Sequence, residues 1–247
     1  MKQLVLHIPH SSTNIPLFDG YVVGKSILDA ETLKLTDWYV DELFYSESDL
    51  MIVADFSRIL CDVERFADDN EEIMSEFGMG ALYERTDNGD LMRKLTTEQK
   101  NFILKEYYWK HHERLYNAVE NQLKEHSNVL IIDCHSFSDT PFNRDLDKTS
   151  IRPDINIGTD EYHAPKSIVD FTTRYFEDNG YSVGIDYPYS GTIVPMNYYK
   201  KDVKVKSIMI EINRKLYLEG STNIKSKNFE VIKAVIDDYL QMLKVNT

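Results

Sequence analysis

The stretch NVLIIDCHSF, residues 128 to 137, contains an apolar run that ends abruptly in polar side chains. Residues from Val129 to Ile132 are aliphatic and show no helical period, which is typical of a strand buried on both faces of a sheet. Asp133 and His135 follow directly. In open α/β sheets, ligand sites lie beyond the carboxyl ends of the strands. The stretch therefore predicts a buried strand that carries site residues at its carboxyl end.

Two other stretches repeat this pattern of an apolar strand followed by polar side chains. QLVLHIPHSS (residues 3 to 12) leads into His10, and SIMIEINR (residues 207 to 214) leads into Glu211. Because the carboxyl ends of parallel strands meet at one edge of a sheet, we expect these side chains to lie near His135. Two strand-end histidines and a strand-end glutamate indicate a metal site.

Segments with a helical period alternate with these strands, most clearly at residues 97 to 126. The chain contains no internal repeat and no low-complexity linker. It is therefore expected to form a single α/β domain over residues 1–247, with a mostly parallel or mixed sheet covered on both faces. The expected strands are 3–8, 50–54, 129–132 and 207–213, with 55–66 extended and a turn at 88–89. Residues 181–199 are expected to form a strand, a loop and then a strand or turn. The expected helices are 97–126, 164–179 and 226–244. Residues 26–46 are expected to be helical in at least their second half, where Thr36 would cap a helix that begins at Asp37.

The composition excludes several classes of protein. A net charge of -13 with scattered Lys and Arg argues against nucleic-acid binding. No apolar run approaches the roughly 20 residues of a membrane span, and the N-terminus lacks the pattern of a signal peptide. Only two cysteines, Cys61 and Cys134, are present in a chain large enough to fold without disulfides. We therefore expect a cytoplasmic protein with neither nucleic acid nor membrane as a partner; its oligomeric state is not predicted.

Cys134 lies beside His135 and offers a possible nucleophile. Adjacent residues of a strand point to opposite faces of the sheet, so the thiol and the imidazole are not expected to meet. A buried cysteine usually behaves as a small hydrophobic side chain. We therefore expect Cys134 to belong to the core.

His10 and His135 are the strongest candidates for metal ligands. A catalytic zinc site takes about three protein ligands and leaves one position for water, so a third ligand is needed. Asp37 can supply it, although an aspartate at a helix start can equally serve the helix dipole. Asp133 is the other option, but a carboxylate two residues before a ligand histidine fits better as its hydrogen-bond partner.

Glu211 ends an apolar strand, where an acidic side chain is unfavourable unless it is paired or functional. Beside a metal it can take a proton from water and pass it to a leaving amine. Its structural alternative is an ion pair with Arg214. Arg58 and Arg65 flank an acidic segment, and their guanidinium groups suit either a substrate carboxylate or a structural ion-pair network.

Other polar side chains are weaker candidates. Asp154 and Asn197 occupy loop positions of the kind that line clefts, and we expect Asn197 to contribute to substrate binding. His111 and His112 lie on the predicted helix 97–126. We expect this pair at the surface or at an interface, with His112 a minor candidate for the site.

The chain resembles the N-formylglutamate amidohydrolase family through nine stretches in the same order. They are IPHSS, TDWYVDEL, SRILCDVERF, FGMGALYERT, the YYWKHH helix, DCHSF, PDINIGT, GYSVGIDYPYSG and IEINRKLY. The family is similar in fold to zinc carboxypeptidases and aspartoacylase. The resemblance implies a phosphorylase/hydrolase-like three-layer α/β/α sandwich with a mixed, mostly parallel central sheet.

The resemblance also implies roles for individual residues. His10, Asp37 and His135 would be the ligands of one catalytic Zn²⁺, and Glu211 the general acid/base. Arg65 and Arg58 would hold a substrate carboxylate.

Two positions depart from the related patterns. Thr13 stands where the carboxypeptidase pattern has a glutamate ligand, three residues after the first histidine. Glu64 stands where the family usually has asparagine, in Asp-x-Asn-Arg. Its negative charge would weaken binding of an anionic substrate unless Arg58 neutralises it.

The sequence thus predicts a zinc-dependent amidohydrolase that cleaves an N-acyl amino acid, with N-formyl-L-glutamate as the family's type substrate. Two alternatives remain. One is a degenerate member that binds without turnover. The other is a hydrolase of the same chemistry acting on a peptide or cell-wall amide.

Overall fold

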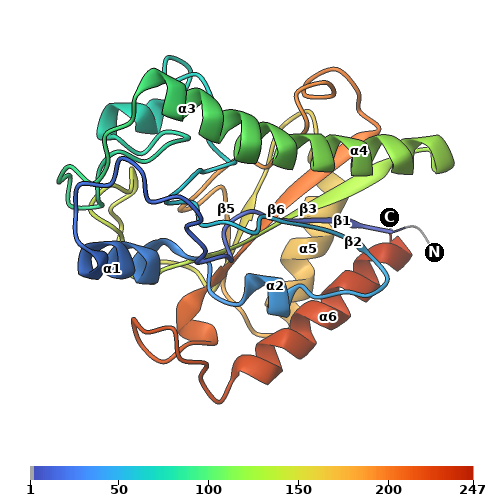
Figure 1. The fold of residues 1–247 in the computed structure, drawn as a ribbon. Coiled ribbons are helices and arrows are strands. Elements are labelled where there is room, and N and C mark those ends of the chain that lie inside the picture. The colour runs from blue at the N-terminus through green and yellow to red at the C-terminus, as the bar shows by residue number, and fades with distance from the viewer. Residues whose placement is uncertain (1–2, 247) are drawn as a thin grey trace.

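A mixed six-stranded sheet forms the centre of the computed structural model, which describes residues 3–246 (Figure 1). The order is β2-β1-β3-β6-β4-β5, and all neighbours are parallel except β4 and β6. The predicted α/β fold with a mixed, mostly parallel sheet is confirmed. The strands are β1 (Val5–Ile8), β2 (Leu50–Val53), β3 (Val129–Phe137), β4 (Ile155–Gly158), β5 (Val183–Ile185) and β6 (Val205–Asn213).

Helices cover both faces of the sheet (Figure 1). On one face lies a long helical segment that begins with α3 (Thr97–Ile103), passes through a π-helical turn (Leu104–Tyr108) and continues as α4 (Trp109–Glu125). On the other face lie α2 (Val40–Leu43), α5 (Lys166–Asp178) and α6 (Phe229–Asn246). Helix α1 (Lys25–Leu35) lies to one side, and two short 3-10 helices span Ile73–Phe77 and Arg214–Leu216. Among the described residues, no helix combines the length and apolarity that a membrane span requires.

Strand β3 separates two apolar cores, because its successive side chains point to opposite faces. Val129 and Ile131 pack against Leu115 and Val119 of α4. Leu130, Ile132 and Cys134 belong to the larger core beneath α5 and α6. Burial raises the pKa of the Cys134 thiol well above its ordinary value. The expectation that Cys134 is a core residue is therefore confirmed.

Two expectations about local structure are wrong, and one strand was not predicted. The helix expected to begin at Asp37 is only the short α2, because Asp37 lies in the turn between α1, which ends at Leu35, and α2. Residues 55–66 form turns rather than an extended segment. The polar stretch after β3 contains a strand, β4, whose four residues are all buried. Helix 97–126 is confirmed; Thr96 caps it in a reciprocal capping box with Gln99.

Candidate metal centre and cavity

The strand register brings polar side chains from three strands to one edge of the sheet. His7 of β1 lies opposite Asp133 of β3, and His135 of β3 lies opposite Glu211 of β6. Asp133 and His135 are two residues apart, so both point to the same face. His10 follows β1 just beyond its carboxyl end. The sheet therefore brings the strand-end polar groups together, as predicted.

His10, Asp37 and His135 form a buried cluster whose ligand atoms lie within 4.8 Å of one another. Asp37 Oδ2 is 3.1 Å from His135 Nδ1 and 3.6 Å from His10 Nδ1. The turn carrying Asp37 is held by its amide, which donates to the His10 carbonyl at 3.0 Å. His10 Nδ1 is buried and has no hydrogen-bond partner in the described part of the chain. A nitrogen of this kind, facing a carboxylate and a second imidazole, fits a metal ligand.

A carboxylate lies behind each histidine of this cluster. Asp62 Oδ1 is 2.8 Å from His10 Nε2, and Asp133 Oδ1 is 3.1 Å from His135 Nε2. Each carboxylate accepts the Nε2 proton and so leaves Nδ1 free for a metal. Carboxylate partners of this kind orient ligand histidines and raise their basicity. The donor set of two imidazole nitrogens and one carboxylate oxygen suits a catalytic zinc ion.

The electrostatics of the cluster favour a positive charge. Burial lowers the pKa of His135, but Asp133 and Asp37 outweigh burial and raise the pKa well above its ordinary value. Burial raises the pKa of Asp37, but contacts with His10, His135 and Arg214 lower it well below its usual range. The pocket thus holds Asp37 as a carboxylate, the form that binds a cation.

Glu211 lies beside His135 without the ion pair that could explain it structurally. Arg214 Nη2 donates to Asp37 Oδ1 at 2.9 Å, and Arg214 Nε donates to the Ser136 hydroxyl. Glu211 Oε2 is buried and has no hydrogen-bond partner among residues 3–246. Burial raises the pKa of Glu211 to about 8. The side chain is therefore poised near neutral pH to exchange a proton.

Arg58 and Arg65 both line the same cavity, but they differ in their partners. Arg58 Nη2 donates to Asp62 Oδ2 at 2.8 Å, and Arg58 Nε donates to the Tyr83 hydroxyl at 3.1 Å. Arg65 Nε lies 3.7 Å from Asp62 Oδ2 and makes no hydrogen bond within the described residues. Arg65 therefore has more capacity left for a ligand carboxylate.

Glu64 is neutralised by a residue other than the one expected. Its Oε1 lies 3.2 Å from His7 Nδ1, whereas Arg58 pairs with Asp62. Burial lowers the pKa of His7, but Asp133 and Glu64 outweigh burial and raise it to about 9. The partner of Glu64 is therefore His7.

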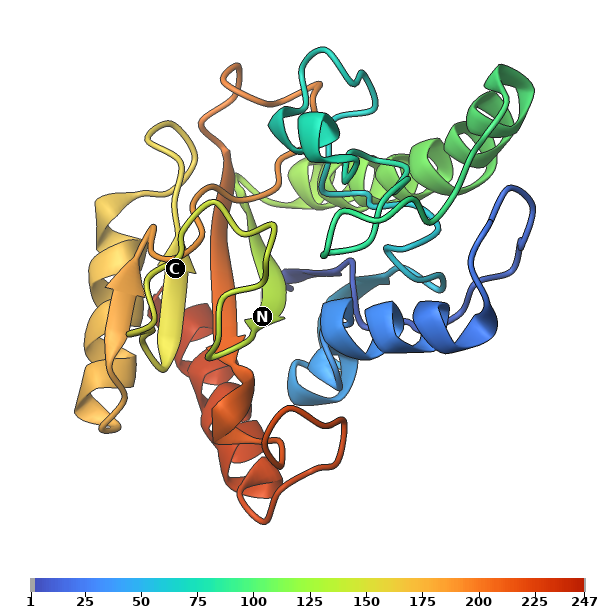
Figure 2. The same cartoon turned by 90° about the vertical axis from the view of Figure 1, so that its left-hand side faces the viewer.

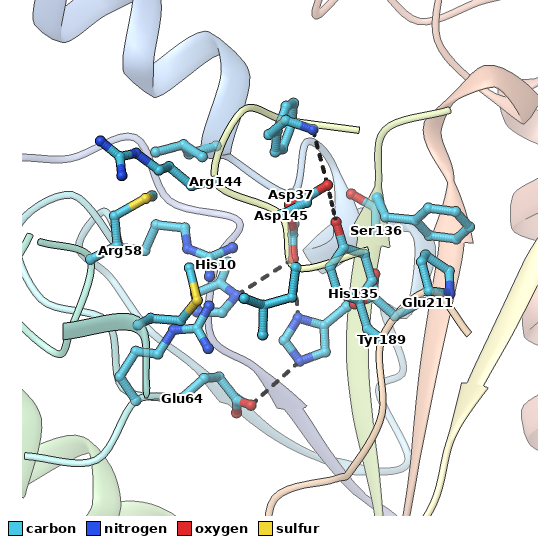
Figure 3. Close-up of a pocket in the computed structure, with 18 of the residues that line it drawn as sticks. His10, Asp37, Arg58, Glu64, His135, Ser136, Arg144, Asp145, Tyr189 and Glu211 are labelled. Carbon is cyan, nitrogen blue, oxygen red and sulfur yellow. Dashed lines mark hydrogen bonds and ion pairs between the residues drawn. The ribbon is translucent and has the colours of Figure 1, made fainter. Parts of the chain in front are cut away.

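These side chains open onto a cavity of about 430 Å³ (Figure 3). One wall comes from the segment after β3, which supplies Phe142, Arg144, Asp145 and Leu146. The guanidinium of Arg152 holds Asp145 Oδ2 at 2.8 Å. The sequence did not single out these residues. The available signal was the length of that segment, since long irregular loops in compact domains are usually functional.

Some predicted residues lie outside the cavity. Asn197 is exposed in the turn after Pro195 and is not among the cavity-lining residues. Asp154 instead bonds to Ser182 and Lys215. His111 is buried and His112 half-buried, so their expected surface position is wrong. His112 Nε2 lies 2.9 Å from the Val63 carbonyl and braces the segment that carries Asp62 and Glu64.

The fold and the His-Asp-His cluster place the molecule among three-layer α/β proteins whose strand ends carry a candidate metal centre. The family model for N-formylglutamate amidohydrolase matches residues 2–218. The chain therefore belongs to the N-formylglutamate amidohydrolase family, a family of carbon-nitrogen hydrolases.

Two solved structures share the fold. One is an N-formylglutamate amidohydrolase from Ralstonia eutropha JMP134, with 23% identity, a TM-score of 0.83, and coverage of 98% of this chain and 93% of that chain. The other is a gene product from Agrobacterium tumefaciens, with 15% identity, a TM-score of 0.67, and coverage of 99% and 90%. No curated protein matches this chain significantly.

Proposed function

We propose that this protein is a metal-dependent amidohydrolase that cleaves the amide bond of a small N-acyl amino acid, with N-formyl-L-glutamate as the first substrate to test. The observation that carries the proposal is the buried His10–Asp37–His135 cluster, with a carboxylate behind each histidine and an unpaired Glu211 alongside. Family membership supplies the reaction class.

His10, Asp37 and His135 would hold the metal, through the two Nδ1 atoms and an Asp37 oxygen. A zinc ion bound there would polarise the acyl carbonyl and lower the pKa of water towards about 7. Arg214 keeps the Asp37 carboxylate oriented by its 2.9 Å hydrogen bond to the other oxygen.

Glu211 acts as the general acid/base. Its carboxylate takes the proton of the attacking water and returns that proton to the departing amine nitrogen. A pKa raised to about 8 by burial suits both steps, because both protonation states are accessible near neutral pH. Proton transfer of this kind typically contributes about 10²–10⁴-fold to the rate.

Arg65 binds the carboxylate of the amino acid. Arg58, which pairs with the same Asp62 carboxylate, adds positive charge to this part of the cavity. The cavity of about 430 Å³ lies within the range of roughly 300–1,000 Å³ that is usual for small-molecule sites. This size favours a small N-acyl amino acid over a peptide or cell-wall amide. The contact between Glu64 and His7 also weakens the case for a degenerate binding protein, because Glu64 is the residue that departs from the family's arginine motif.

Hydrolysis of N-formyl-L-glutamate by the zinc-loaded protein, followed as released glutamate, tests the proposal. We expect Glu211→Gln to lower kcat by about 10²–10⁴-fold while KM changes little. Glu219→Gln, at an exposed acidic residue, is the matched control and should retain full turnover. Full activity of Glu211→Gln would disprove the role of Glu211, and an inert zinc-loaded wild type would disprove the substrate.

A further inference from the structure

A second cluster of metal-ligand type lies beside the first and consists of His7, Glu64 and Asp133. It shares no residue with the His10–Asp37–His135 cluster. His7 and Asp133 are fully buried, whereas the Glu64 side chain is 18% exposed and lines the cavity. Glu64 thus offers a path by which an ion can enter from the cavity.

The spacing of the second cluster matches the edges of a metal coordination shell. His7 Nδ1 is 2.9 Å from Asp133 Oδ1 and 3.2 Å from Glu64 Oε1. Ligands bonded to a cation at about 2.0–2.2 Å and set roughly 90–110° apart lie about 2.8–3.6 Å from one another. The corresponding distances in the first cluster are 3.1 and 3.6 Å. The two clusters therefore have similar ligand spacing.

His111 of α4 occupies the far side of the His7 ring. The two Nε2 atoms are 2.8 Å apart, a hydrogen-bond distance at which one nitrogen carries the proton and the other accepts it. A neutral His111 can accept the Nε2 proton of His7 and leave Nδ1 directed at the two carboxylates. In that arrangement the Nδ1 lone pair of His7 faces the carboxylates of Glu64 and Asp133. This is unfavourable unless a positive charge lies between the nitrogen and the carboxylates. A proton on Nδ1 or a metal cation can supply it.

Asp133 connects the two clusters through a single carboxylate oxygen. Its Oδ1 contacts His7 Nδ1 and also His135 Nε2, while its Oδ2 accepts the Ile193 amide at 3.0 Å. In Figure 3, dashed contacts leave both nitrogens of the His135 ring, towards Asp37 and towards Glu64. The His135 ring therefore lies between the two clusters.

We propose that His7, Glu64 and Asp133 bind a second divalent cation, which makes this a two-metal centre. One imidazole nitrogen and two carboxylates suit Zn²⁺ or Mn²⁺. A divalent cation there offsets the two negative charges of Glu64 and Asp133. Glu64 then presents no net negative charge to an anionic substrate.

Metal counting on the full chain tests this proposal. The protein is stripped with a chelator, dialysed against Zn²⁺ or Mn²⁺, and analysed by mass spectrometry for bound metal. We expect about two ions per wild-type chain and about one in Glu64→Gln. Asp145→Asn is the matched control, because it removes a carboxylate from the same cavity that belongs to neither cluster, and it should keep about two.

Anomalous diffraction at the metal edge on wild-type crystals locates each ion without any substitution. Peaks at both clusters support the inference. A peak only at His10–Asp37–His135, with about one ion in all three proteins, overturns it and leaves a proton on His7. A peak only at His7–Glu64–Asp133 overturns both the two-metal centre and the metal centre of the proposed function. No peak at either cluster overturns both.

Discussion

Along one face of β3, Val129 and Ile131 pack under α4, whereas Asp133 and His135 on the same face enter a polar centre. The apolar half is complete, because each side chain is buried against other apolar groups. The polar half also satisfies most of its groups, yet His10 Nδ1 and Glu211 Oε2 are left without hydrogen bonds among the described residues. Unsatisfied buried groups in an otherwise satisfied network are where functional sites are expected.

Replacing one residue in each half is the strongest test of this contrast. His135→Ala removes a predicted ligand, so turnover should fall by more than the roughly 100-fold seen when only a ligand's hydrogen-bond partner is lost. The decrease should appear in kcat/KM for N-formyl-L-glutamate, together with loss of metal from the first cluster. Normal activity of His135→Ala would show that His135 of β3 is not part of the active site.

The matching change in the apolar half is Ile131→Ala. It leaves a cavity between the sheet and α4, so the free energy of unfolding should fall by about 2–5 kcal/mol. Urea denaturation measures this loss. Metal content per folded molecule should stay the same, and a loss of metal would mean that the two halves are not independent.

Within the polar half, Arg65 and Arg58 can be compared in the same way. Arg65→Met should raise KM by about 10–100-fold, because a charge-assisted hydrogen bond contributes roughly 1.5–3 kcal/mol. Arg58→Met should instead lower stability, since it leaves the buried Asp62 carboxylate without its closest guanidinium. Steady-state kinetics and urea denaturation of both variants separate the two outcomes. Equal KM values for Arg65→Met and wild type would disprove substrate binding by Arg65.

The smallest expected effect concerns the pH dependence of stability in the metal-free protein. The folded-state pKa of Glu211, about 8, exceeds its ordinary value, so the charged form disfavours the folded state. The resulting destabilisation is absent below about pH 4, grows as pH rises, and is complete above about pH 8. Glu211→Gln should therefore melt at a higher temperature than wild type above pH 8, by roughly 2–4 °C per kcal/mol. The two proteins should melt together near pH 4, and a constant difference at all pH values would contradict the pKa.

Sequence periodicity was sufficient for the parts of the fold where apolar residues dominate. β1, β3, β6 and the 97–126 helix were predicted because their burial follows a simple period. Strand β4 was missed because Ile155 to Gly158 is short and begins beside a polar loop. Its antiparallel pairing with β6 depends on tertiary contacts, which no local sequence pattern encodes.

The site residues at the ends of strands could be predicted from the sequence, whereas the site residues on loops could not. His10, His135 and Glu211 were visible as polar residues after apolar runs. The partnership of His7 with Glu64 and Asp133 was not visible, because it joins residues that are up to 126 positions apart. The cavity wall from residues 142–146 was likewise hidden, since loop positions carry no periodic signal.

The interior position of β1 has a consequence for biosynthesis. Val5–Ile8 is made before the strands it pairs with, which are Leu50–Val53 on one side and residues 131–133 of β3 on the other. At about 5–20 residues per second, the nascent chain must wait roughly 6–25 s before β3 is made, and longer for β6. During that interval an apolar strand with an unpaired edge is exposed outside the ribosome, and such a strand is a target for chaperones. The proposed amide-cleaving centre cannot assemble until residue 211 has been translated.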